Sequence, residues 1–197
     1  MDAVETLRRI GLGLAVLGAL CFADAPFRTF RQRFVEQRSR ARLVLVSLEL
    51  DLIGLWAVGR FYLHRDFALA PPAAAPVLAA LGLAVLTAGI GLSVWAKFRL
   101  GRWFSATFAV KEGHELVTDG PYAVTRHPIY TGILIALAGA GLLADSGLTL
   151  ILAPLFALPL FLHTVYEEHL FERHFGAPYF EYQRTVPRLL PFVRPRP

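Results

Sequence analysis

Five apolar blocks alternate with polar, arginine-rich segments along the 197-residue chain. The blocks cover residues 10–25, 42–63, 71–96, 128–144 and 148–166. A helix crosses the ~30 Å hydrocarbon core of a bilayer with roughly 20 residues, and the blocks come close to or exceed that length. The pattern therefore predicts an all-α fold: a polytopic membrane helix bundle with five transmembrane helices and a C-terminal helical hairpin.

Two of these blocks allow a second interpretation. The first block is short and follows two arginines, which is also typical of a cleaved signal peptide, but Phe22 and Asp24 make a poor cleavage site and favour a retained helix. The second block carries Glu49 and Asp51, whose charges are costly in lipid unless they face a cavity or a partner. They are candidates for a functional lining, or they snorkel or pair with a neighbouring helix.

The last three blocks contain the signals for close helix packing. Pro71 and Pro72 open the third block. Small residues in this block allow helices to approach closely in lipid, namely Ala79, Gly82, Gly89 and Gly91. Only residues 145–147 separate the fourth and fifth blocks, so these two must form a tight antiparallel hairpin.

Composition and charge support this picture and add an orientation. The chain is 55% hydrophobic and only 18% charged, with a mean hydropathy of +0.50, whereas soluble domains carry about 25% charged residues. With Cys21 as its single cysteine, the chain can form neither an internal disulfide nor a cysteine-based zinc site. Five spans place 16 of the 20 basic residues on one side, which predicts an outside N-terminus and a cytoplasmic C-terminus. The net charge of +5 then points to anionic membrane lipids rather than nucleic acid.

Residues that carry chemistry gather at two places in the sequence. The first runs from His114 to Gly132 and leads into the fourth block, and the second begins at Glu167 and Glu168, where the fifth block ends. Because the hairpin is tight, it brings His127 and its neighbours close to these two glutamates. Carboxylates, imidazoles and tyrosine rings at a membrane boundary suit a ligand that bears both a positive charge and an aromatic ring, such as a sulfonium compound. Taken singly, the aromatic residues could be membrane anchors and the glutamates an ordinary helix end.

These two segments resemble the isoprenylcysteine carboxyl methyltransferase family, within the wider group that includes phospholipid methyltransferases. The residues that carry the resemblance are His114, Leu116, Val117, Thr118, Gly120, Tyr122, Arg126, His127, Pro128, Tyr130 and Gly132, followed by Glu167, Glu168, Phe175, Gly176, Tyr179, Tyr182, Val186, Pro187 and Arg188. The resemblance covers about residues 100–192. It implies a single domain over residues 1–197, with a three-helix membrane part at 1–97 and a cofactor-binding and catalytic part at 98–197.

The resemblance also implies S-adenosylmethionine as the cofactor, bound in a cytoplasmic pocket, and a lipophilic or prenylated acceptor that enters from the bilayer. The implied cofactor-binding residues are His114, Glu115, Leu116, Val117, Gly120, Tyr122, His127, Pro128, Ile129, Tyr130, Glu167 and Glu168. Glu167 is expected to stabilise the cofactor, and His163 or Arg126 to orient the acceptor; no metal is expected. The family often has an arginine where this chain has His163, so the acceptor and the kind of atom methylated stay open.

Other functions remain open on the sequence. A membrane NADPH-dependent oxidoreductase similar to sterol reductases has a related C-terminal region, and a phospholipid amine N-methyltransferase belongs to the same wider group. A metal site formed by His163, Glu167 and His169 is a further hypothesis, although zincin spacings are absent. A non-catalytic membrane scaffold would bind neither cofactor.

Overall fold

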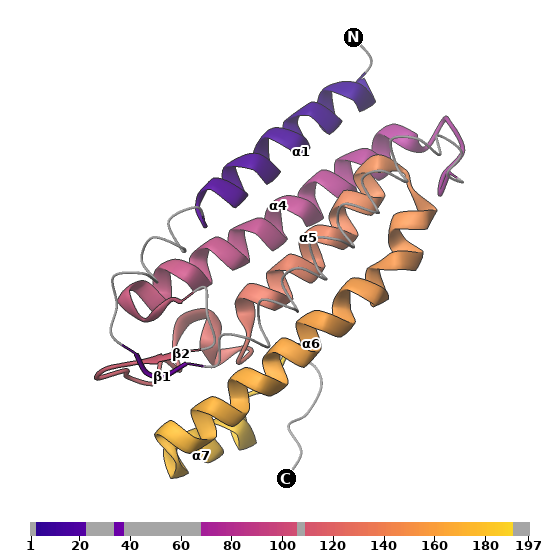
Figure 1. Ribbon diagram of the computed structural model, residues 1–197. Helices are drawn as coiled ribbons and strands as arrows, with labels where there is room; N and C mark the ends of the chain where they lie inside the picture. The colour runs from indigo at the N-terminus through magenta and orange to yellow at the C-terminus, as the bar shows by residue number, and fades with distance from the viewer. Residues whose placement is uncertain (1–2, 23–33, 38–67, 106–108, 191–197) are drawn as a thin grey trace.

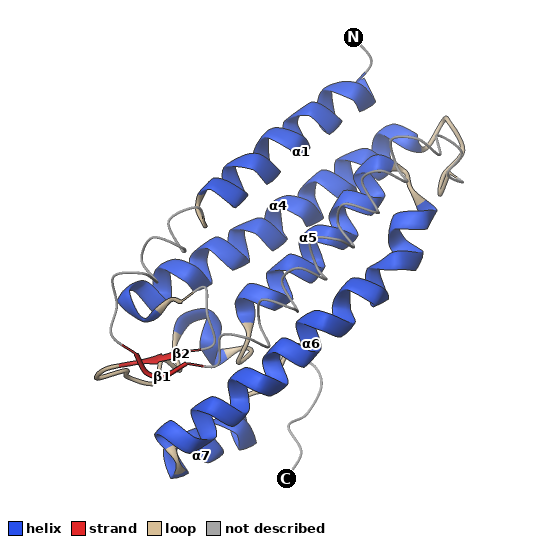
Figure 2. Cartoon of the chain, viewed as in Figure 1, coloured by secondary structure: helices blue, strands red, loops and turns tan. Residues whose placement is uncertain are grey.

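The computed structural model describes residues 3–22, 34–37, 68–105 and 109–190. The elements, in chain order, are α1 (Ala3–Leu20), β1 (Phe34–Gln37), α4 (Ala75–Leu100), β2 (Ala109–Lys111), α5 (Pro128–Ala144), α6 (Gly147–Phe175) and α7 (Ala177–Thr185), with short 3-10 helices at Gly101–Trp103 and Gly120–Ala123 (Figure 2). The predicted second span, with Glu49 and Asp51, lies outside the described residues, so the number of five spans stays a prediction.

Four long helices lie side by side in the order α1, α4, α5, α6 (Figure 1). Along the helix axes, the turn between α5 and α6 lies at one end of the bundle, and the β1–β2 pair and α7 lie at the opposite end. Within the described part of the chain, one helix, running from Ala75 into Trp103, is long and apolar enough to cross a membrane. Helix α5 is apolar but has only 17 residues.

Helices α4 and α5 pack along small residues. Gly82 and Gly89 of α4 lie so close to the backbone of α5 that an added Cβ would come within 3.0 Å of it, and the same holds for Gly132 and Gly139 of α5 against α4. This close antiparallel approach is the physical use of the small residues that the sequence predicted. Gly91 is an exception to the prediction, because a Cβ there would meet nothing within 4 Å.

Local signals set the ends of α5 and α6. Pro128 begins α5, where its missing N–H leaves no bond unmade. Helix α5 ends at Ala144 and is followed by Asp145, which adopts the left-handed conformation with φ 54°. Ser146 caps α6 by accepting a hydrogen bond from the Thr149 N–H at 3.1 Å. The tight antiparallel hairpin is therefore present, with two connecting residues rather than three.

Polar contacts fasten the end of the bundle at this hairpin. Arg8 donates from Nη2 to the Ala144 carbonyl at 3.0 Å, which places a cation at the negative end of the α5 dipole. Asp145 Oδ1 accepts hydrogen bonds from the backbone N–H groups of Leu69 and Ala70 at 2.8 and 3.2 Å. The N-terminal helix, the hairpin turn and the segment that precedes α4 are thus joined to one another.

Two features differ from the prediction. Helix α6 continues to Phe175, nine residues beyond the predicted end, because the polar residues that end the apolar block are also good helix formers. A short antiparallel sheet pairs β1 with β2, so the fold is mostly helical rather than all-α. Two three- to four-residue strands that are more than 70 positions apart leave no readable period in the sequence. Both features lie at the end of the bundle where the candidate site is found.

Candidate functional site

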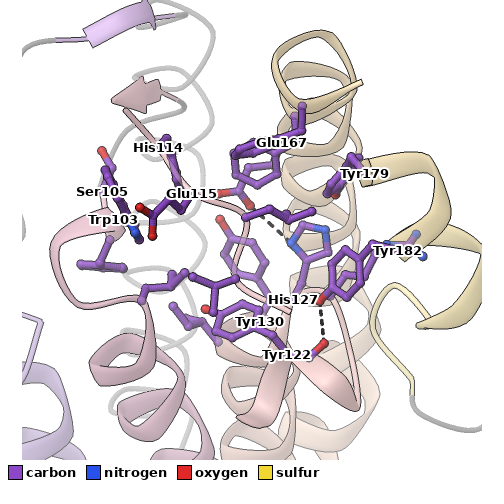
Figure 3. Close-up of a pocket in the computed structure, with 18 of the residues that line it drawn as sticks. Trp103, Ser105, His114, Glu115, Tyr122, His127, Tyr130, Glu167, Tyr179 and Tyr182 are labelled. Atoms are coloured by element: carbon purple, nitrogen blue, oxygen red, sulfur yellow. Dashed lines mark hydrogen bonds and ion pairs between the residues drawn. The ribbon is translucent and has the colours of Figure 1, made fainter. Parts of the chain in front are cut away.

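A cavity of about 320 Å³ opens at the end of the bundle that carries the sheet and α7 (Figure 3). The 3-10 helix after α4, the loop at 114–117, the start of α5, and helices α6 and α7 together enclose it. The lining side chains are Phe22, Leu100, Trp103, Phe104, Ser105, His114, Glu115, Leu116, Val117, Tyr122, Arg126, His127, Ile129, Tyr130, Ile133, Glu167, Phe171, Phe175, Tyr179 and Tyr182. The cavity is mainly apolar. Its charged side chains come from three places: Glu115 from the loop at 114–117, Arg126 from the segment that precedes α5, and Glu167 from α6.

The structure brings most of the predicted cofactor-binding residues to this cavity. Nine of the twelve line it: His114, Glu115, Leu116, Val117, Tyr122, His127, Ile129, Tyr130 and Glu167. The other three, Gly120, Pro128 and Glu168, do not. Gly120 occupies a positive-φ position in the turn before the first lining tyrosine, and Pro128 is buried as the first residue of α5. The cofactor-binding role of these three residues stays a prediction.

His127 connects α5 to both glutamates of α6. Its ring Nδ1 lies 3.4 Å from Glu167 Oε2, and its Nε2 lies 3.1 Å from Glu168 Oε1 (Figure 3 shows the first contact). Burial alone lowers the pKa of His127, but the hydrogen bonds to Glu167 and Glu168 outweigh burial and raise that pKa above its ordinary value. The sequence prediction that the hairpin brings these residues together is confirmed.

Glu168 faces away from the cavity into a cluster of cations. The side chain is 2% exposed. Arg126 Nε donates to its Oε1 at 2.9 Å, and Arg188 donates to its Oε2 from Nε at 3.0 Å and from Nη2 at 2.6 Å. Arg126 also donates to the carbonyls of Gln183 and Val186. The Arg126 guanidinium borders the cavity, yet its donors are engaged by protein groups.

His114 forms part of an aromatic wall. Its ring stacks on Trp103 with centroids 4.9 Å apart and meets the edges of Phe171 and Phe175 at 5.9 and 5.5 Å. Burial, followed by the positive charges of Lys111 and His174, lowers the pKa of His114 to about 4. Its Nδ1 is buried without a hydrogen-bond partner among the described residues. The ring is therefore neutral at pH 7 and has an unused polar atom.

Three tyrosines close the opposite wall. The Tyr182 hydroxyl donates to the Tyr122 carbonyl at 2.6 Å, which joins α7 to the turn before α5. Tyr179 is almost completely buried and packs against Tyr182, Phe171 and Phe175. Burial is the main reason that the pKa of each of these hydroxyls lies above its ordinary value, so all three stay protonated. The wall is thus rigid and neutral.

His163 lies one turn before Glu167 on α6 and does not line the cavity. It is buried, and its ring meets the edge of Tyr130 with centroids 6.1 Å apart. Within the described ranges, no group of three or more His, Cys, Asp or Glu side chains could hold a metal ion. His169, the third residue of the metal hypothesis, is exposed and lies 3.2 Å from Glu172. The three residues of that hypothesis therefore do not come together.

Sequence reasoning missed the aromatic half of the cavity. Trp103, Phe104 and Phe171 were not among the candidates, and Phe175, Tyr179 and Tyr182 were noted only as part of the resemblance. A signal existed in the last part of the chain, because aromatic residues recur there every four positions, at 171, 175 and 179. For Trp103 there was none, since its place depends on the 3-10 helix that turns the chain back after α4.

Acid is expected to destabilise the fold through His114. Its folded-state pKa of about 4 lies below the ordinary value of 6.5, so between these values the unfolded chain binds more protons. The stabilising contribution is complete above pH 6.5 and is lost as the pH falls through about 4. In thermal unfolding at pH 4.5 and 7, a His114→Phe variant should show a smaller difference between the two melting temperatures than the parent protein. Equal differences in both proteins would contradict the assignment.

The helical arrangement matches that of a solved membrane enzyme. The eukaryotic intramembrane Ras methyltransferase ICMT (isoprenylcysteine carboxyl methyltransferase) aligns with 98% of this chain and 69% of its own chain, with a TM-score of 0.61 and 20% sequence identity. At this identity the match establishes the fold alone. The fold is that of an intramembrane methyltransferase, which confirms the predicted membrane helix bundle; the orientation stays a prediction.

The sequence comparisons then define the family. The family model described as phospholipid methyltransferase matches residues 77–178, just over half of the chain. The chain therefore belongs to the phospholipid methyltransferase family.

Individual relatives carry two kinds of name. The chain is 34% identical over 115 residues to Protein-S-isoprenylcysteine O-methyltransferase B of Arabidopsis thaliana, covering 57% of this chain and 58% of the relative. It is 35% identical over 116 residues to the nickel-cobalt-cadmium resistance protein NccN of Alcaligenes xylosoxydans xylosoxydans, covering 56% and 52%. The chain thus spans little more than half the length of these relatives. The predicted resemblance to the isoprenylcysteine carboxyl methyltransferases is confirmed.

Proposed function

We propose that this chain is an integral membrane methyltransferase that uses S-adenosylmethionine and acts on a lipophilic acceptor, as the isoprenylcysteine carboxyl methyltransferases do. The observation that carries this proposal is the cavity itself, whose lining combines aromatic side chains with the Glu167 carboxylate. Cations bind to aromatic faces and to carboxylates, and both attractions strengthen where water is excluded. A ligand with a sulfonium group and an aromatic base matches this combination.

The residues of the cavity fit S-adenosylmethionine in three ways. The volume of about 320 Å³ is within the common range for small-molecule sites, ≈ 300–1,000 Å³. Trp103 and Tyr130 contribute aromatic rings to the lining, and Glu167 contributes a negative charge. The buried Nδ1 of His114 lacks a partner among the described residues, and a neutral imidazole there can bond to a polar atom of a base. When bound, S-adenosylmethionine supplies an electrophilic methyl group.

The chain's own residues then position the reactants and exclude water. Glu167 holds the cationic part of the cofactor, and His127 fixes the orientation of Glu167 from the side. The apolar side chains of Leu116, Ile129 and Ile133 keep the site dry, which strengthens every charge interaction within it. Bringing two reactants together in the correct geometry is the main contribution that methyl transfer needs from the protein.

The acceptor side of the site differs from the sequence expectation. Because the donors of Arg126 are engaged by Glu168 and by two carbonyls, we assign Arg126 a supporting role rather than contact with the acceptor. His163 stays the candidate for orienting the acceptor, indirectly, because it is buried and packs against the ring of Tyr130, which lines the cavity. A carboxylate acceptor needs no base, whereas for an amine acceptor Glu167 could accept the proton.

Transfer of radiolabel tests the proposal. The purified protein in lipid vesicles is given methyl-labelled S-adenosylmethionine with one of three acceptors: a prenylcysteine analogue, phosphatidylethanolamine or a small lipophilic acid. We expect label in the prenylcysteine analogue or the acid, released by base because the product is a methyl ester. Base-stable label in phosphatidylethanolamine would instead identify an amine N-methyltransferase. No label with any acceptor, together with calorimetric binding of NADPH and not of S-adenosylmethionine, would overturn the proposal in favour of an oxidoreductase.

A further inference from the structure

We propose that Glu168 is a positioning residue: together with Arg126 and Arg188 it fixes the His127 ring, which in turn holds Glu167 toward the cavity. This inference rests on the proposed function, because Glu167 is the residue assigned to the cofactor. It gives adjacent glutamates different tasks. Glu167 lines the cavity, whereas Glu168 lies behind it and touches no part of it.

The contacts of Glu168 fill its capacity as an acceptor. Oε1 receives Arg126 at 2.9 Å and lies 3.1 Å from His127 Nε2. Oε2 receives Arg188 at 2.6 and 3.0 Å and Gln183 at 3.3 Å. A carboxylate in a buried site is stable only when it is paired and hydrogen-bonded in this way. The Glu168 side chain is therefore fixed from four directions, and it presents one defined oxygen to His127.

The cation on the far side of Glu168 comes from a segment that is fastened to the start of α5. Arg126 N–H donates to the Pro187 carbonyl at 2.9 Å, and His127 N–H donates to the Arg188 carbonyl at 3.1 Å. Thr131 Oγ1 donates to the Leu189 carbonyl at 2.7 Å. The segment at 187–189 therefore runs along the start of α5, and Arg188 reaches Glu168 from it.

These contacts define the state of the His127 ring. A carboxylate can only accept hydrogen bonds, so the Nε2 contact with Glu168 places a proton on that nitrogen, and the approach of Glu167 to within 3.4 Å of Nδ1 favours a proton there as well. Among the described residues, His127 alone lies within ion-pair distance of Glu167. The doubly protonated ring thus holds one oxygen of Glu167 and leaves the other for a ligand.

The charged and titratable groups around His127 come from four directions. On α6 they are Glu167 and Glu168, and next to the ring itself they are Arg126 and Tyr130. Arg188 faces it through Glu168 from the C-terminal segment, and Tyr179 and Tyr182 face the same carboxylate from α7. Of these groups, the Glu168 carboxylate is the one that carries a negative charge, bonds to the His127 ring and does not line the cavity. Its removal therefore changes the charge next to the ring without altering the cavity lining.

The test is a Glu168→Gln variant, which keeps the shape of the side chain and removes its charge. The matched control is Glu172→Gln, one turn later on α6, whose carboxylate accepts from the same Gln183 at 2.8 Å but does not reach His127. Binding of S-adenosylmethionine is measured by calorimetry between pH 6 and 9, and the ring nitrogens of ¹⁵N-histidine-labelled protein are followed by NMR over the same range without ligand.

We expect Glu168→Gln to weaken binding of S-adenosylmethionine by about tenfold at pH 8, equivalent to about 1.4 kcal/mol. The binding curve should begin its decline at a lower pH than in the parent protein, and the His127 signal should lose its second proton at a lower pH. The control should match the parent in each respect. Wild-type pH dependence in both measurements for Glu168→Gln would overturn the proposal.

A second variant covers the case in which Glu168→Gln does not fold. Arg188→Gln removes the far cation while leaving Glu168 in contact with His127, so the negative charge next to the ring is less neutralised and the His127 signal should lose its second proton at a slightly higher pH than in the parent protein. An unchanged signal in folded Arg188→Gln would also count against the network. If the parent protein binds no S-adenosylmethionine, the proposed function fails, whereas the NMR measurement still decides the state of His127 by itself.

Discussion

Replacing Glu167 by glutamine is expected to weaken binding of S-adenosylmethionine at least about 30-fold, because losing one partner of a desolvated charge pair costs roughly 2 kcal/mol or more. The substitution preserves size and removes the negative charge from the cavity lining. It also leaves Nδ1 of His127 without its carboxylate. Calorimetric titration of the purified protein measures the change, and the rate of methyl transfer should fall in parallel.

The control for this experiment is Glu181→Gln. Glu181 lies on α7, is largely exposed, and pairs with Arg184 at 3.6 Å on the surface. Exposed pairs of this kind contribute about 0–1 kcal/mol, so the control should bind S-adenosylmethionine like the parent protein. Normal binding by folded Glu167→Gln would show that the cofactor does not depend on this carboxylate, and the assignment of Glu167 would be wrong.

Replacing Gly89 by alanine is expected to destabilise the bundle by about 3 kcal/mol or more, the upper range for an overpacked core. The new Cβ would lie less than 3.0 Å from backbone atoms of Ala136 and Gly132 in α5. Backbone in a helix cannot move aside as a flexible side chain can, so the two helices must separate. Thermal unfolding in detergent should show a melting temperature lower by about 6–12 °C, at 2–4 °C per kcal/mol for a chain of this size.

Gly91→Ala is the matched control, and its effect should have the opposite sign. It lies on the same helix only two positions away, and a Cβ there would meet nothing within 4 Å. Alanine is favoured over glycine in a helix by about 0.8–1.0 kcal/mol, so this variant should be as stable as the parent or more stable. Equal destabilisation by both substitutions would mean that helix propensity, and not the approach of α5, explains the glycines.

The contact between His127 and the glutamates could be predicted because it follows from a short connection. The fourth and fifth blocks must be antiparallel because very few residues join them. His127, which precedes the fourth block, and Glu167 and Glu168, which follow the fifth, therefore lie at the same end of the hairpin. The observed distances of 3.4 and 3.1 Å from the His127 ring confirm this reasoning. The residues of the loop at 114–117 were not found in this way: the family resemblance implied them, and the structure places them at the cavity.

The different positions of Glu167 and Glu168 could not be derived from the residue pattern, although the family resemblance implied a cofactor role for Glu167. Adjacent residues on a helix point about 100° apart, so one glutamate faces the cavity and the other faces Arg126 and Arg188. Which one does so depends on the rotation of α6 about its axis. That rotation is set by packing against α5 and α7, about which the order of the residues carries little information.

The amino-acid sequence by itself determined the helical membrane class, the hairpin, and the segments that meet at the site, because the length of apolar blocks and the length of their connections are local properties. The tertiary structure alone decided which face of each helix is used. Helix α4 is apolar all round, so no polar stripe marks its buried side, and only the close approach of α5 distinguishes Gly89 from Gly91. The aromatic wall of Trp103, Phe171 and Phe175 likewise exists only once distant segments have packed together.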